Sequence, residues 1–187
     1  MLFSFLKFCV AEGSEKKEIK ITELSAGLLW GTGFQISTDS KINYINTLLL
    51  VGFDSVSLGI FSEAGDMIKV LKNIDKNNSH TKILVTAQSL PAVDAASKYP
   101  EIDSVILASA SATKSEYFAQ NPDAVLIELK EGGCQSFTVS MFNPGAQLKC
   151  PSTMQIINLL AATKSPHGLR LLNFETAWNI GKKIFSP

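Results

Sequence analysis

Strand-like and helix-like hydrophobic patterns alternate between residues 19 and 108, and this alternation is the feature that most restricts the fold. Short apolar runs typical of strands occur at 19–24, 54–60, 82–87 and 103–108. Segments with apolar residues at helical spacing lie between them, at 38–51, 66–74 and 91–98. Strands and helices that alternate at this pace predict a parallel sheet with right-handed helical crossovers, as in a TIM barrel.

The pattern changes in the last third of the chain. Two β-patterned runs, 124–130 and 135–142, flank the sequence EGGC and predict a β-hairpin near 124–142. In a competing interpretation, 135–142 is instead the fifth strand of the parallel sheet. Two further helices are predicted at 153–163 and 173–184 from their helical spacing.

The length of the chain limits how much of a barrel it can form. A complete barrel has eight strands and about 250 residues, whereas this chain has 187 residues. We therefore predict an α/β fold with an incomplete or shortened TIM-barrel-like parallel sheet and flanking helices, plus the hairpin. We expect one domain over 19–187. Because an incomplete sheet has edges that must be covered, we also expect a protein partner or self-association.

Residues 1–18 form a separate N-terminal segment, with an apolar part at 1–10 and a polar linker at 11–18. A helix that spans a bilayer needs about 20 apolar residues, so 1–10 is too short to cross one. It also lacks the basic start and the cleavage site of a secretory signal. We interpret 1–10 as an appended strand or docking segment, with membrane-surface docking or targeting as the alternative.

The charge balance excludes one class of partner. Lysine and arginine together number 17, and aspartate and glutamate together also number 17, so the net charge is zero. A surface that binds a phosphate backbone needs a basic surplus, so we do not expect nucleic-acid binding. Arg170 is the only arginine, which argues against a site built on bidentate recognition of carboxylate or phosphate.

The cysteines and histidines do not form a metal-binding pattern. Cys9, Cys134 and Cys150 are scattered, and the two histidines, His80 and His167, lie far apart in the sequence. Disulfide frameworks and zinc sites need closer and more regular spacing. We expect reduced thiols and a cytoplasmic location, with the mitochondrial matrix as the alternative.

Several stretches carry a resemblance to a known family. They are ELSAGLLWGTGFQISTDSKINYINTLLLVGFDSV from Glu23, then KILVTAQSLPAVDAASKYPEIDSV and ASASATKSEYF, and finally CPSTMQIINLL and GLRLLNFETAWNIGKKIF. In this order the chain resembles hydroxymethylglutaryl-CoA lyases of the DRE-TIM metallolyase superfamily. The resemblance implies a TIM barrel, a divalent metal such as Mg²⁺, and cleavage of a carbon–carbon bond. The interior strands of the family are shortened or absent in this chain.

The chain departs from the family where the chemistry lies. The family's Arg-Asp pair, which polarises the substrate and ligates the metal, falls on Ala26 and Gly27, and no His-x-His motif exists in the sequence. Losing these groups should abolish metal binding, so we expect no cofactor. Gly132-Gly133-Cys134 resembles the family's lid loop and makes Cys134 a catalytic candidate. Two glycines between strands are also what a turn requires.

Three other residues are candidates for contact with a ligand. Glu23 lies where the first predicted strand ends, which is where barrel active sites lie. Trp30 belongs to the glycine-containing run 27–33, which fits no nucleotide-binding motif and which we interpret as packing or a contact surface. Lys114 follows the hydroxyl-rich sequence at the end of the fourth predicted strand, where an anion could bind.

Three functional hypotheses follow from the resemblance and its departures. The first is a non-catalytic protein on a degenerate lyase-like scaffold that acts as a structural or interaction subunit of an oligomer or larger assembly. The second is a surviving carbon–carbon lyase acting on hydroxymethylglutaryl-CoA or a related acyl-CoA. The third is a module that binds an acyl-CoA or another small molecule without chemistry.

Overall fold

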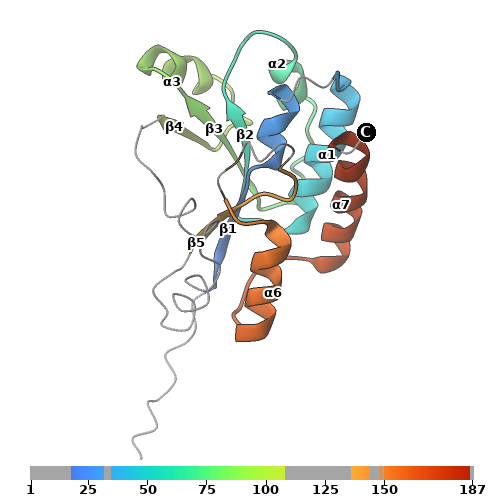
Figure 1. Cartoon of the computed structure of the whole chain (residues 1–187). Helices are drawn as coiled ribbons and strands as arrows, with labels where there is room; N and C mark the ends of the chain where they lie inside the picture. Colours follow the sequence, from blue (N-terminus) through green and yellow to red (C-terminus); the bar gives the residue numbers. More distant parts are fainter. Residues whose placement is uncertain (1–17, 32–34, 108–135, 144–147, 149, 186–187) are drawn as a thin grey trace, which may run out of the picture.

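A five-stranded parallel sheet forms the centre of the computed structural model, which describes residues 18–31, 35–107, 136–143, 148 and 150–185 (Figure 1). The strand order is β4-β3-β2-β1-β5. The bounds are β1 Lys20–Glu23, β2 Ser55–Ile60, β3 Lys82–Ala87, β4 Ser104–Leu107 and β5 Ser136–Val139. The strands β1 to β4 therefore lie side by side in sequence order, which confirms the predicted α/β fold with a partial TIM-barrel-like sheet.

Strand β5 lies beside β1, although a long stretch of sequence separates them. The two strands pair in parallel along their whole length, with Ile21 opposite Phe137 and Glu23 opposite Val139. In a closed barrel the last strand takes this place beside the first. The interpretation of 135–142 as a strand of the parallel sheet is thus confirmed for Ser136–Val139. The other half of the predicted hairpin, 124–130, lies outside the described residues.

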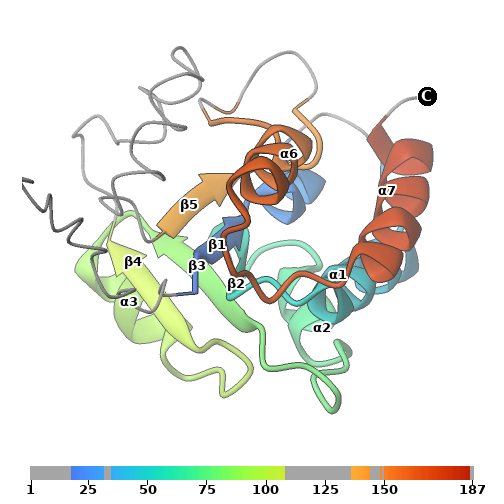
Figure 2. The same ribbon diagram turned by 90° about the horizontal axis from the view of Figure 1, so that it is seen from below.

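Six helices accompany the sheet in the described part of the chain. Their bounds are η1 Ser25–Trp30, α1 Thr38–Val51, α2 Met67–Leu71, α3 Leu90–Ala96, α6 Thr153–Thr163 and α7 Leu171–Phe185. In Figure 2, α1, α2 and α7 lie together on one side of the sheet, and α6 lies beside β1 and β5. None of the helices in these ranges has the length and apolar character needed to cross a bilayer.

Local sequence signals explain where the helices begin and end. The Ser37 side chain accepts a hydrogen bond from the Ser40 amide at the start of α1, and α1 ends at Gly52 with a φ of 89°. Ser152 caps α6 and forms a capping box with Gln155. Helix η1 is a 3-10 helix that the sequence patterns did not predict.

The core joins the sheet to the helical layer. Strands β2 and β3 bury Val56, Leu58, Ile83 and Val85. Between α1 and α7 lies an aromatic cluster of Tyr44, Phe142, Phe174, Trp178 and Phe185. Gly181 makes this contact possible, because a Cβ there would overlap the Phe142 ring. This packing holds α7 against α1.

Candidate functional site

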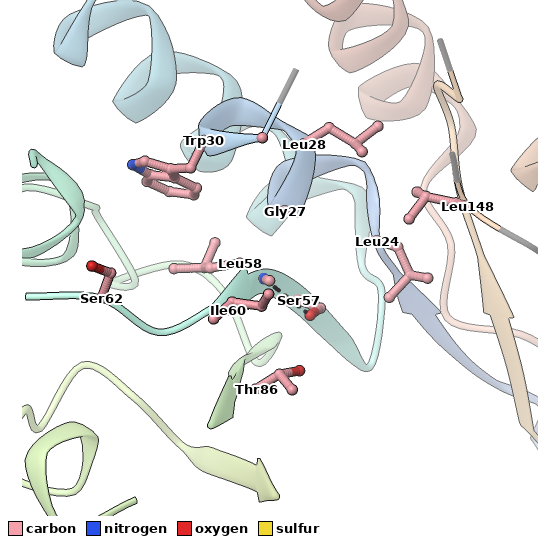
Figure 3. Close-up of a pocket in the computed structure, with 12 residues that line it drawn as sticks. Leu24, Gly27, Leu28, Trp30, Ser57, Leu58, Ile60, Ser62, Thr86 and Leu148 are labelled. Carbon is pink, nitrogen blue, oxygen red and sulfur yellow. Dashed lines mark hydrogen bonds between the residues drawn. The ribbon is translucent and has the colours of Figure 1, made fainter. Parts of the chain in front are cut away.

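A pocket of about 460 Å³ lies at the carboxyl ends of β1, β2 and β3 (Figure 3). This is the end of a parallel barrel sheet at which active sites are built. The lining residues come from η1, β2, β3 and the loops that follow the strands. They are Leu24, Gly27, Leu28, Trp30, Gly31, Ser57, Leu58, Gly59, Ile60, Ser62, Thr86 and Leu148. The lining is mostly apolar, and these residues include neither a carboxylate nor a basic side chain.

Two glycines bring η1 against β2 on one wall of the pocket. A Cβ on Gly27 would lie 3.1 Å from the Cα and the amide nitrogen of Gly59. Gly59 has a φ of +78°, and the pairing of β2 with β3 shifts register between Ser57 and Ile60. Side chains at either position would push the two backbones apart. Glycine at both positions therefore sets the shape of this wall.

Trp30 is held at one end of the pocket by a polar cluster. Its indole Nε1 donates a hydrogen bond of 2.9 Å to Asp66 Oδ1, and Lys41 Nζ lies 5.3 Å from the centre of its ring. Asp66 also accepts hydrogen bonds from Thr38 at 2.8 Å and forms an ion pair with Lys41 at 2.8 Å. The indole is thus fixed by contacts made outside the pocket.

The charge state of Asp66 supports this arrangement. Partial burial raises its pKa, but the hydrogen bonds from Lys41, Thr38 and Trp30, together with the charge of Lys41, outweigh that effect. The pKa of Asp66 therefore lies below its usual value. The carboxylate stays ionised at neutral pH and keeps Trp30 in place.

Two hydroxyl groups face the pocket away from Trp30. Ser57 is 8% exposed, and its Oγ accepts a hydrogen bond of 3.3 Å from the Gly59 amide. Within the described residues, neither the Ser57 hydroxyl hydrogen nor the Thr86 hydroxyl has a protein acceptor. In Figure 3 these two side chains lie beyond Leu58 and Ile60 when viewed from the indole. The pocket therefore has an aromatic end and a hydroxyl end.

Glu23 lies beneath this region and is fully buried. Its Oε1 accepts hydrogen bonds from the amides of Ser25 at 2.9 Å and Met141 at 2.8 Å, and its Oε2 accepts one from Thr153 Oγ1 at 2.6 Å. These partners lie on η1, after β5 and at the start of α6. Glu23 does not line the pocket.

Burial dominates the titration of the groups around Glu23. Desolvation raises the pKa of Glu23, and the hydrogen bonds from Thr153, Met141 and Ser25 counteract it only in part. Tyr44 donates to or accepts from Ser25 Oγ at 2.7 Å, and its pKa lies well above the usual value because it is buried and near Glu23. The same two causes raise the pKa of the Cys150 thiol to about 12. Both groups therefore stay protonated near neutral pH, which disfavours them as nucleophiles.

Ala26 and Gly27, on which the lyase resemblance places an Arg-Asp pair, are packed into the structure. Ala26 is fully buried in η1, and Gly27 contacts Gly59. Across the described ranges, no three histidine, cysteine, aspartate or glutamate side chains gather to hold a metal ion. The residues at these positions do not fit a divalent metal. Cys134 and Lys114, the other predicted site residues, lie outside the described residues.

No protein-family model matches the chain, and no curated protein matches it in sequence. Among solved structures, the chain is similar to the hydroxymethylglutaryl-CoA lyase of Brucella melitensis, with 16% identity, a TM-score of 0.41, and coverage of 76% of this chain and 58% of the lyase. The lyase of Pseudomonas aeruginosa gives 17% identity and a TM-score of 0.43, over 79% of this chain and 55% of the lyase.

The lyase of Acinetobacter baumannii, solved in complex with coenzyme A and 3-methylmalate, gives 15% identity and a TM-score of 0.44, over 94% of this chain and 66% of the lyase. The chain thus spans between 55% and 66% of the length of these three lyases. With TM-scores below 0.5 and identities of at most 17%, these similarities assign neither a family nor an activity.

Proposed function

We propose that this chain is a non-catalytic domain that binds a small molecule in the pocket at the carboxyl ends of β1, β2 and β3. The observation that carries the proposal is the composition of the pocket. Its volume of about 460 Å³ lies within the usual range of ligand sites, and its described lining is apolar with hydroxyl groups. Such a lining favours binding, but it supplies no general acid, general base or metal ligand.

The packing of Ala26 and Gly27 supports the non-catalytic part of the proposal. A side chain that ligates a metal at position 27 would need room that the Gly59 backbone occupies, because even a Cβ there lies 3.1 Å from it. Glu23, the carboxylate nearest to this position in sequence, is engaged by three protein donors. Lyase chemistry through these residues would require a different backbone.

Thermal denaturation with a panel of uncharged small molecules and acyl-CoA compounds tests the proposal. A ligand that binds only the folded chain raises the melting temperature. Gly31→Phe and Thr86→Phe place a ring in the pocket from two different elements, and Gly31 has room because a Cβ there meets nothing within 4 Å. We expect stabilisation in the wild type and in Gly31→Ala, and its loss in both phenylalanine variants. No stabilisation by any compound would contradict the proposal.

The surface of α7 favours a second function, as an interaction subunit that associates with itself or another protein. Leu171 is 56% exposed and Leu172 is 78% exposed at the start of α7, and Leu50 on α1 is 40% exposed. The Asn173 amide donates to the Leu50 carbonyl, so these leucines belong to one neighbourhood. Exposed apolar surface of this kind favours contact with a protein.

Light scattering tests self-association. We expect the wild-type chain to have a molecular mass above that of the monomer, and the Leu172→Glu variant to have a lower mass than the wild type. A monomeric mass for both wild type and variant would contradict self-association.

A further inference from the structure

The lining of the pocket also restricts the chemistry of its ligand. We propose, as a deepening of the binding function above, that the ligand is an uncharged aromatic molecule with a hydrogen-bond acceptor oxygen, such as an aryl ketone. Three features of the described lining carry this inference: its lack of charged groups, the fixed indole of Trp30, and the free hydroxyl donors of Ser57 and Thr86.

The absence of charge in the described lining selects a neutral ligand. Moving an ionised group from water into an apolar site is strongly unfavourable unless an opposite charge or several hydrogen bonds receive it. The two described charges that hold Trp30, Lys41 and Asp66, neutralise each other at 2.8 Å, and Thr38 and Trp30 further engage Asp66. Neither charge is free to pair with a ligand.

The indole of Trp30 favours an aromatic ligand. Its nitrogen is engaged by Asp66 at 2.9 Å, and Lys41 lies 5.3 Å from its ring centre, so the ring is held in one orientation beside the pocket. Figure 3 shows the ring above Leu58, with its nitrogen turned away from Gly27 and Leu28. Because the ring does not have to be ordered on binding, a second aromatic ring can stack against it at low entropic cost.

The hydroxyl end of the pocket favours an acceptor oxygen on the ligand. Ser57 is nearly buried, and one lone pair of its Oγ accepts from the Gly59 amide, so its O–H is left to donate to a ligand. Thr86 adds a second hydroxyl on the neighbouring strand. A donor enclosed by apolar side chains gains most from a ligand acceptor such as a carbonyl or ether oxygen.

Acetophenone and three matched compounds, each differing from it in one property, test the inference. The three are ethylbenzene without the oxygen, benzoate with a negative charge, and cyclohexyl methyl ketone without the aromatic ring. We expect acetophenone to bind most tightly by ligand-observed NMR. Ethylbenzene should bind roughly 3- to 10-fold more weakly because it leaves the donors unpaired, and benzoate on the order of 100-fold more weakly because its charge is buried without a partner.

Variants of the lining residues test which residue is responsible for the pocket's preference for an acceptor oxygen and for an aromatic ring. Ser57→Ala and Thr86→Val should weaken acetophenone roughly 3- to 10-fold and leave ethylbenzene unchanged. Trp30→Leu should weaken both aromatic compounds more than cyclohexyl methyl ketone. Binding to the wild type that is lost in Gly31→Phe supports the binding function of the pocket. If benzoate or ethylbenzene then binds as tightly as acetophenone, the inferred class of ligand is overturned while the binding function stands. If none of the four compounds nor any other molecule binds, both fail.

Discussion

Thr153 Oγ1 donates a hydrogen bond of 2.6 Å to Glu23 Oε2, across 130 residues of sequence. Both residues are fully or almost fully buried. The bond connects the end of β1 to the first turn of α6, while the other carboxylate oxygen binds the amide of Met141 just after β5. Glu23 therefore joins β1 to the residue after the neighbouring strand β5 and to the start of α6, and it fixes these late elements of the chain onto β1.

Removing the Thr153 hydroxyl should destabilise the fold. Thr153→Val leaves Glu23 Oε2 without its partner in the interior, and we expect a loss of about 1–3 kcal/mol in the free energy of unfolding. Thr153→Ser is the matched control, because it keeps the hydroxyl and should lose less. Urea denaturation gives both values. Equal losses in the two variants would show that the bond to Glu23 does not stabilise the fold.

Glu23 should make the stability depend on pH in a direction opposite to that of most carboxylates. Its pKa is raised in the folded chain, chiefly by burial, so the folded state holds the proton more tightly than the unfolded state. Its contribution is fully present below the usual glutamate pKa and is lost as the pH rises through the folded-state pKa. Glu23→Gln stays uncharged and keeps the shape of the side chain.

Urea denaturation of wild type and Glu23→Gln across this pH range isolates the effect. We expect the stability of the variant relative to the wild type to increase as the pH rises. A difference that stays constant with pH would mean that Glu23 titrates alike in the folded and unfolded chains.

The close contact of Gly27 and Gly59 should tolerate no side chain. Gly59→Ala places a Cβ 3.1 Å from Gly27 and requires a φ of +78°, and we expect it to destabilise the chain by about 1–3 kcal/mol. Gly31→Ala is the control, since a Cβ at Gly31 meets nothing within 4 Å. Thermal denaturation compares the two variants. A stable Gly59→Ala variant would show that η1 and β2 are not held this closely.

The wild-type chain should not release acetoacetate from hydroxymethylglutaryl-CoA with Mg²⁺ or Mn²⁺. The reason is that Ala26 and Gly27 offer no groups for substrate or metal, and the space around them is filled. A coupled spectrophotometric assay measures the release. Metal-dependent turnover that Cys134→Ala abolishes would instead establish the carbon–carbon lyase hypothesis.

The sequence predicted the repeated elements well, because local signals define them. The limits of α1 and β3 follow directly from apolar spacing and from Gly52. The placement of β5 was harder to predict, since pairing with β1 depends on contacts distant in the sequence. The resemblance to lyases places the Arg-Asp pair on Ala26 and Gly27 at the end of the first strand, whereas β1 ends at Glu23 and both residues lie in the 3-10 helix η1.

The candidate site was predicted only in part. Trp30 was singled out and lines the pocket, but its anchor Asp66 lies just before α2, and no local pattern connects the two. Ser57 and Thr86 are ordinary strand residues in the sequence, and only the bulge in β2 and the parallel pairing bring their hydroxyls to the pocket. Glu23 was expected near a ligand, but its carboxylate is turned toward Thr153 at the start of α6. No spacing in the sequence reveals this contact between β1 and α6.

The most direct test of the account is an NMR titration of the labelled wild-type chain with acetophenone, followed through the backbone amides. We expect shifts that saturate at Leu24, Gly31, Ser57, Gly59 and Thr86, which line the pocket, with little change in α7. Saturating shifts confined to α7, or no shifts at concentrations where acetophenone remains soluble, would contradict the claim that this pocket binds such a ligand.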